Sequence, residues 1–192
     1  MPSSSQNEDR HGHYFAHSPN DDGAGTAEPL RCHLQAVADR AATFARPFGA
    51  EEQARAAGLL HDLGKYADRF QERLRNPAKS AGDHWSVGAA VLTLTTARGL
   101  GLLPALAIAA HHAGLEDLPP GENAADCSRQ LAKAIARRMK DDAAPFSDTD
   151  AQRLRRRFEE DGFALPQITR GLLPSEVAVS VFDFYILVSQ RP

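Results

Sequence analysis

Apolar residues recur every three or four positions along most of the chain, which is the spacing of one face of an α-helix. A first helix is expected from Glu28 onward, with an inward stripe formed by Leu34, Val37, Ala41, Phe44 and Phe48. A second helix is expected over residues 50–63, and a short third one from Tyr66 to Leu74. No series of alternating apolar and polar residues indicates strands, so the pattern predicts an all-α, compact multi-helix bundle.

The second half of the chain continues the helical pattern. Asp83 is placed to cap a helix, whose inward face would carry His84, Val87, Val91 and Leu94. Another apolar stripe runs to His111, with Gly114 as the expected C-terminal cap. A helix over residues 126–140 would turn inward the side chains of Leu131, Ile135 and Met139.

Two segments near the C-terminus allow more than one interpretation. Asp148 is expected to cap a helix that carries the arginines Arg153, Arg155, Arg156 and Arg157. These could track a DNA backbone, but Glu159, Glu160 and Asp161 follow at once, which favours an ordinary solvated helix surface. Residues 177–188 are apolar nearly all round and predict a buried helix, although their β-branched content leaves a strand possible.

Composition limits the function classes. The 192 residues suit one domain, expected over residues 14–192 after a flexible polar tail at 1–13. The net charge of -3 argues against a basic nucleic-acid coat. The two cysteines form no CxxC motif and fit a cytoplasmic location. We expect no membrane association, because the longest apolar run is too short to span a bilayer.

The chemistry centres on the adjacent pair His61-Asp62, which follows an apolar helix that Gly64 is expected to end. Other polar residues join this pair on inward faces or at helix ends: His33, His84, His111, His112 and, in the late apolar run, Asp183. One buried histidine is ordinary, but each unsatisfied polar group costs about 1–3 kcal/mol. A shared divalent cation would satisfy them together, so we interpret the set as a metal centre between helices.

The ligand types narrow the choice of metal. Thiolates are absent from the set, which disfavours a structural zinc cage. Imidazoles mixed with a carboxylate suit Mn, Fe, Co, Ni or Zn better than Mg. Even without Asp183, six ligands exceed what one ion with an open position needs, so two ions bridged by Asp62 are expected. Such a pair is suited to phosphoester hydrolysis.

Several stretches, in order, resemble the HD nuclease domain of CRISPR-associated type I interference proteins, within the HD phosphohydrolase superfamily. The resemblance runs from Tyr14 to about Leu118 and rests on Tyr14-Phe15-Ala16-His17-Ser18, His33-Leu34, Gly58-Leu59-Leu60-His61-Asp62-Leu63-Gly64-Lys65, Phe70-Gln71, His84-Trp85-Ser86 with Gly88-Ala89, and His111-His112-Ala113-Gly114-Leu115. A bare His-Asp dipeptide would not be specific, whereas blocks recurring in order are.

The resemblance implies a helical domain that cuts single-stranded DNA with two divalent ions, drawn from Mn, Ni, Co, Fe or Mg. It implies one ion held by His33, His61 and Asp62, with Asp183 closing that site. It implies a second ion held by Asp62, His84, His111 and His112. His61, Asp62 and Lys65 would be catalytic, with Lys65 supporting the site or touching a phosphate; the alternative is a surface lysine paired with Asp68.

The implied partners are single-stranded DNA, a separate or fused helicase, and the CRISPR RNA-guided surveillance complex. The chain has no GxxxxGK[ST] motif of its own, so it resembles a stand-alone nuclease subunit or the N-terminal part of a longer protein. Two alternatives stay open. The same ligands would serve a phosphohydrolase acting on a nucleotide in a closed pocket. The isolated position of Asp183 also allows a degenerate metal-binding module with an incomplete first site.

Overall fold

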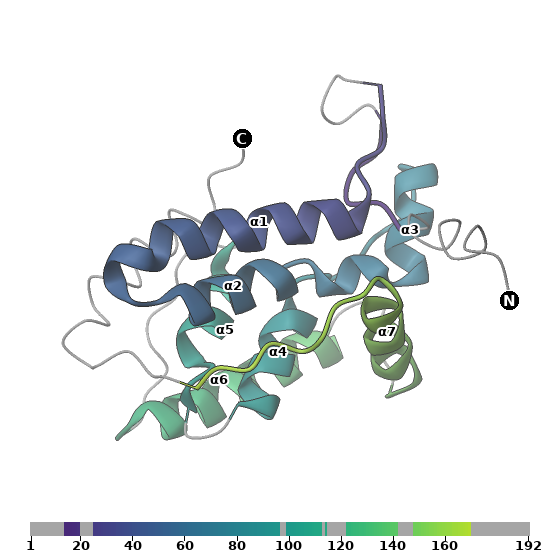
Figure 1. Cartoon of the computed structure of the whole chain (residues 1–192). Coiled ribbons are helices and arrows are strands. Elements are labelled where there is room, and N and C mark those ends of the chain that lie inside the picture. The colour runs from purple at the N-terminus through teal and green to yellow at the C-terminus, as the bar shows by residue number, and fades with distance from the viewer. Residues whose placement is uncertain are drawn as a thin grey trace, which may run out of the picture.

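The computed structural model is a bundle of α-helices joined by short turns (Figure 1). It describes residues 14–19, 25–96, 99–112, 114, 122–141 and 148–169. Within these ranges there are seven α-helices, and the only β-type pairing is the isolated bridge between Phe15 and Pro29. The all-α prediction is therefore confirmed. The expected tail at 1–13, the apolar segment 177–188 and Asp183 lie outside the described residues.

The helices are α1 (Leu30–Ala45), α2 (Glu51–Leu60), α3 (Asp68–Arg75), α4 (Ser86–Thr95), α5 (Leu102–Ala110), α6 (Ala124–Asp141) and α7 (Asp148–Glu160). Two short 3-10 helices, η3 (Arg46–Phe48) and η4 (Leu63–Tyr66), follow α1 and α2. Helix α1 packs along α2, and α4 packs against both α5 and α6 (Figure 1). Across the described ranges, every helix is too short or too polar to traverse a lipid bilayer.

Helix α1 buries only part of the predicted face: Leu34 and Ala41 are buried as expected. Phe44 and Phe48, expected in the core, are 51% and 43% exposed. The buried face is formed instead by small and aliphatic residues, namely Leu30, Leu34, Ala38, Ala41, Ala42 and Ala45. The reason is the close approach of α2: a Cβ on Gly58 would lie 2.5 Å from the Cα of Ala38. Alanines permit this spacing, whereas phenylalanines do not.

Helix α4 also follows its predicted face only in part: Val87 is buried as expected. Asp83 caps it as expected, because its Oδ1 accepts hydrogen bonds from the backbone amides of Ser86 (2.8 Å) and Trp85 (3.2 Å). The helix begins only at Ser86, so His84 precedes it. Leu94, predicted to point inward, is 77% exposed. Leu92 is fully buried instead. Leu92 and Leu94 are two residues apart, which is about 200° around the helix, so they point to opposite sides.

Helices α5 and α6 largely follow the predictions. Helix α5 is buried along nearly its whole length. Gly114 has a φ of 91° and donates its backbone N–H to the carbonyl of Ala110 at 2.7 Å, as expected of a C-terminal cap. In α6, Leu131 and Ile135 are buried and Met139 is partly buried.

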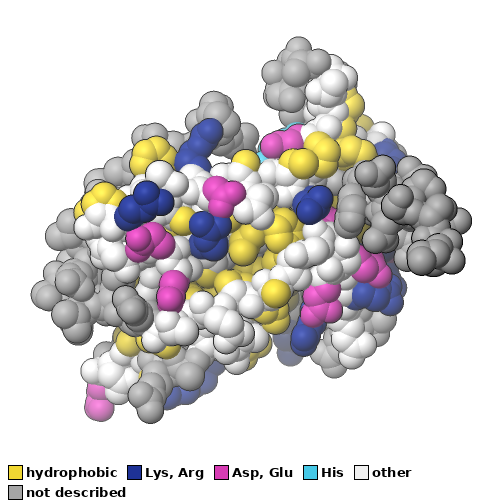
Figure 2. Space-filling view, viewed as in Figure 1, with side chains coloured by type: hydrophobic (Ala, Val, Ile, Leu, Met, Phe, Trp, Pro, Cys, Tyr) yellow, Lys and Arg dark blue, Asp and Glu magenta, His cyan; other side chains and the backbone are white. Residues whose placement is uncertain are grey.

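Helix α7 packs on η4 through polar contacts. The Tyr66 hydroxyl donates to the buried carboxylate of Asp161 at 2.7 Å. Arg153 and Arg157 each bind one carboxylate oxygen of Asp68, both at 2.6 Å. Lys, Arg, Asp and Glu side chains are interspersed on the face seen in Figure 2 rather than gathered by sign. Arg153, Arg155 and Arg156 thus pair with neighbouring acids at the surface, in agreement with the solvated-surface interpretation. Arg157 is largely buried and also donates to the carbonyl of Tyr66.

Candidate metal centre

Four segments bring the predicted site residues together. His33 lies in the first turn of α1, and His61-Asp62 form the turn between α2 and η4. His84 comes from the loop before α4, and His111-His112 follow the last turn of α5. Neighbouring imidazole rings form a row with centroids 4.1–5.4 Å apart, in the order His17, His33, His61, His111, His112, His84.

Gly64 fixes the approach of the His84 loop rather than ending a helix as predicted. Helix α2 already ends at Leu60, and Gly64 lies within η4. Its backbone N–H donates to the carbonyl of His84 at 3.0 Å, and a Cβ there would lie only 2.2 Å from that oxygen. The absence of a side chain at this position therefore lets His84 reach Asp62.

One side of the Asp62 carboxylate meets a set of nitrogens. Its Oδ2 lies 3.0 Å from His61 Nε2, 3.3 Å from His33 Nε2 and 2.8 Å from Lys65 Nζ. The two imidazole Nε2 atoms lie 3.2 Å from each other. Asp62 and His61 are 3% and 6% exposed, so this set is shielded from bulk water.

The other oxygen of the Asp62 carboxylate, Oδ1, has weaker contacts. Oδ1 lies 3.7 Å from both His84 Nε2 and His111 Nε2. That distance is too long for a hydrogen bond, and among the described residues buried Oδ1 has no hydrogen-bond partner. Buried His84 Nδ1 lacks one as well. Each such atom costs about 1–3 kcal/mol, and a bound cation would remove that penalty.

The imidazoles are oriented by hydrogen bonds at their far nitrogens. His61 Nδ1 lies 2.9 Å from the carbonyl of Gly58, and His111 Nδ1 lies 2.6 Å from that of Ile108. A carbonyl only accepts, so Nδ1 carries the proton in each ring. The Nε2 lone pairs of His61 and His111 are then directed at Asp62, which is the arrangement that metal-binding histidines use.

Electrostatics favour a charged Asp62 and a neutral His84. Burial raises the pKa of Asp62, but the adjacent His61 and Lys65 together hold it well below its usual range. Burial lowers the pKa of His84 to about 4. An ionised carboxylate beside a neutral imidazole is the protonation state in which such a pair binds a divalent ion.

The donor atoms form groups of the size that a metal ion requires. Ligand atoms within 4.8 Å of one another are found in His33, His61 and Asp62, and again in Asp62, His84 and His112. His111 reaches the same carboxylate, although it belongs to neither group. All predicted ligands in the described part of the chain thus converge, and Asp62 is common to both groups. Their individual roles stay predictions, as does that of Asp183.

Lys65 is not the surface lysine of the alternative interpretation. It is 6% exposed, and its ammonium lies against Asp62 and the carbonyl of Ala16, at 2.8 Å and 3.2 Å. Asp68, the partner suggested by that alternative, binds Arg153 and Arg157. Lys65 therefore places a positive charge inside the centre.

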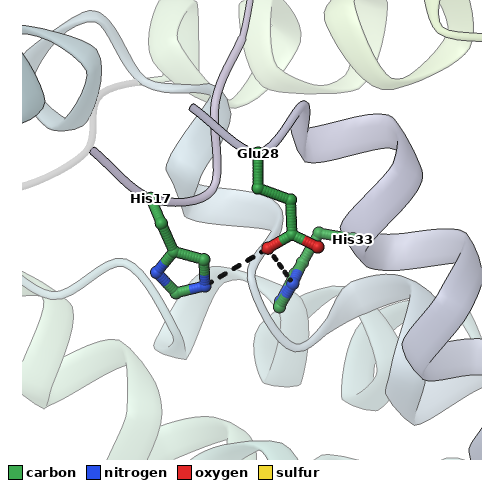
Figure 3. A group of neighbouring side chains, drawn as sticks. All are labelled: His17, Glu28 and His33. Atoms are coloured by element: carbon green, nitrogen blue, oxygen red, sulfur yellow. Dashed lines mark hydrogen bonds and ion pairs between the residues drawn. The ribbon is translucent and has the colours of Figure 1, made fainter. Parts of the chain in front are cut away.

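Two residues at the centre were not among the predicted ligands. His17 and Glu28 lie beside His33, and their ligand atoms form a third group with it within 4.8 Å (Figure 3). His17 stood in one of the sequence blocks, but nothing in the helical pattern singled out Glu28. The bridge between Phe15 and Pro29 brings the two segments together, and no local periodicity encodes such a contact.

Comparison with known proteins agrees with this arrangement. Residues 30–143, more than half of the 192-residue chain, match the HD domain family. The matched range contains every described residue of the two Asp62 groups. No curated protein matches the chain.

Proposed function

The chain belongs to the HD domain family, and we propose that it is a metal-dependent nuclease that cuts single-stranded DNA in CRISPR antiviral defence. Family membership supports a metal-dependent hydrolase in general. The narrower proposal draws on the ordered blocks from Tyr14 to about Leu118 that resemble the HD nuclease domain of type I interference proteins. A helicase and the RNA-guided surveillance complex are its proposed partners.

The observation that carries the proposal is the position of Asp62 between two sets of donors. Its Oδ2 faces His33 and His61, and its Oδ1 faces His84 and His111. A single carboxylate with imidazoles at both oxygens is suited to bridging two divalent ions. When bound, two such ions would polarise a phosphodiester, lower the pKa of a water molecule and stabilise the leaving oxygen.

The chain's own residues prepare this chemistry. The carbonyls of Gly58 and Ile108 hold His61 and His111 with their Nε2 atoms toward the site. Lys65 balances the charge of Asp62, because its ammonium lies 2.8 Å from the carboxylate. The same ammonium is the group we expect to contact a substrate phosphate. His112, which lies between His111 and His84 in the row, is exposed and gives a substrate access there.

One observation favours a nucleotide as the substrate instead. Asp62, His61 and Lys65 are all less than 7% exposed, and enclosed sites suit small molecules. The same phosphorus chemistry would then act on a nucleotide phosphate rather than on a DNA strand. The two functions differ in what is cleaved, not in which residues bind metal.

The test uses the full chain with Mn²⁺, offered circular single-stranded DNA and a panel of nucleotides. We expect the DNA to be cut by the wild type and not by Asp62→Asn. Asp39→Asn is the matched control, because Asp39 is an exposed carboxylate on α1 that binds Arg55 of α2. DNA cutting that persists in Asp62→Asn would overturn the assignment. Hydrolysis of nucleotides without any cutting of DNA would replace it with the second candidate.

A further inference from the structure

Glu28 contacts one ring nitrogen of His33 (Figure 3), and the other ring nitrogen faces Asp62. Its Oε2 lies 3.1 Å from His33 Nδ1. The other ring nitrogen, Nε2, lies 3.3 Å from Asp62 Oδ2 and 3.2 Å from His61 Nε2. His33 therefore joins an acidic side chain on one edge to the metal-binding set on the other.

The contact determines which nitrogen of His33 carries a proton. A carboxylate only accepts, so the hydrogen bond requires N–H at Nδ1, and in the neutral ring this leaves a lone pair at Nε2. His61 is in the same state, because the Gly58 carbonyl holds its Nδ1. Two lone pairs 3.2 Å apart repel each other unless a cation lies near both. The arrangement is therefore prepared for a cation.

We propose that Glu28 is a positioning residue of the metal centre, holding His33 in the tautomer and orientation that direct Nε2 at the ion. This inference rests on the metal centre of the proposed function. Carboxylates that bind the far nitrogen of a metal-ligating histidine fix its orientation and raise its basicity, and their loss weakens metal binding about 10–100-fold.

The backbone around Glu28 is fixed from two directions. Its carbonyl accepts from the amide of Ala16 at 2.8 Å, and the amide of Leu30 donates to the carbonyl of Tyr14 at 2.8 Å. Leu30 is also the first residue of α1, the helix that carries His33. The segment at Tyr14–His17 therefore positions Glu28, and through the carbonyl of Ala16 it also contacts Lys65.

His17 raises the competing interpretation that Glu28 is itself a ligand. His17 Nε2 lies 3.6 Å from Glu28 Oε2, the oxygen that contacts His33. The ligand atoms of His17, Glu28 and His33 lie within 4.8 Å of one another. A separate ion at this position would need Nδ1 of His33 without its proton. His33 would then bind metal through both nitrogens as an imidazolate, which is a costlier arrangement than one hydrogen bond to a carboxylate.

The first experiment measures the tautomer directly in metal-free protein. Long-range ¹H–¹⁵N spectra distinguish a histidine protonated at Nδ1 from one protonated at Nε2. We expect Nδ1–H for His33 in the wild type and in Glu28→Gln, whose amide oxygen accepts the same hydrogen bond, and loss of that preference in Glu28→Ala. A wild-type His33 protonated at Nε2 would overturn the proposal.

The second experiment titrates the full chain with Mn²⁺ by calorimetry. We expect Glu28→Ala to weaken binding about 10–100-fold without changing the number of ions, and Glu28→Gln to retain most of the affinity. The control is Glu72→Ala, since Glu72 is an exposed glutamate paired with Lys79. Thermal unfolding in EDTA is expected to be the same for all variants, which separates positioning from a general loss of stability.

The outcomes distinguish the proposals. Unchanged affinity in Glu28→Ala would overturn the positioning role while leaving the metal centre intact. If Glu28→Gln binds one ion fewer than the wild type, as Glu28→Ala also does, Glu28 is a direct ligand and the proposal is wrong. If the wild type binds no Mn²⁺ at all, the metal centre itself fails, and the tautomer measurement still tests the contact between Glu28 and His33.

Discussion

Replacing Gly64 with alanine tests how the second half of the metal centre is assembled. The new Cβ would lie 2.2 Å from the carbonyl oxygen of His84, 2.6 Å from its Cα and 2.7 Å from its carbonyl carbon. All three atoms belong to the backbone, so no side-chain rotation can relieve the clash. The His84 loop must move away from η4 and from Asp62.

The energetic cost can be worked from these contacts. Separating the segments breaks the hydrogen bond between the Gly64 amide and the His84 carbonyl, which contributes about 0.5–1.5 kcal/mol. Forcing a methyl group into a packed interface costs about 1–3 kcal/mol more. We therefore expect Gly64→Ala to lower the free energy of unfolding by roughly 2–4 kcal/mol. Because His84 moves and His33 and His61 do not, only the group that contains His84 should lose its affinity for metal.

Urea unfolding in EDTA measures the stability, and calorimetric titration of the folded protein with Mn²⁺ measures the sites. Gly49→Ala is the control: no atom lies within 4 Å of its added Cβ, but its φ of +65° is unfavourable for alanine. It should cost about 1–2 kcal/mol through backbone strain alone and leave Mn²⁺ binding unchanged. If Gly64→Ala is as stable as the wild type and binds Mn²⁺ equally well, the close packing of the His84 loop on Gly64 is not what builds the site.

Two further predictions concern the packing of α7 on η4. Tyr66→Phe removes the 2.7 Å hydrogen bond to buried Asp161 and should lower the free energy of unfolding by about 1.5–3 kcal/mol in urea; a change under about 0.5 kcal/mol would contradict it. Burial raises the pKa of Asp68, but the hydrogen bonds and charges of Arg157 and Arg153 lower it by more. The pKa of Asp68 in the folded state therefore lies below its usual value. The folded state therefore binds that proton less readily than the unfolded chain, and stability should fall as the pH drops below about 4. Asp68→Asn should make that fall shallower in acid-titrated unfolding, and an unchanged pH dependence would refute the assignment.

The helical class could be predicted from the sequence because it depends on local signals. Periodic apolar residues place helices whatever their partners are. The position of histidines at helix ends, as at His61 and His111, also follows from the chain itself. The prediction that these histidines form one metal centre rested on the ordered set of sequence blocks around them.

The buried faces and the supporting contacts depend on distant segments, and the sequence could not supply them. Phe44 was assigned to the core by periodicity, yet the close packing of Gly58 on Ala38 favours the alanine face of α1. Gly64 was interpreted as a helix terminator, but its role is to admit the His84 backbone. Glu28 and His17 come together only through the pairing of Phe15 with Pro29.

The central claim is that Asp62 is shared by two metal sites, and anomalous diffraction from crystals grown with Mn²⁺ tests it most directly. We predict two anomalous peaks about 3.5–4 Å apart. One peak should lie within bonding distance of His33 and His61, and the other within bonding distance of His84, with the Asp62 carboxylate between them. A single peak, or two peaks that Asp62 does not touch, would contradict the account.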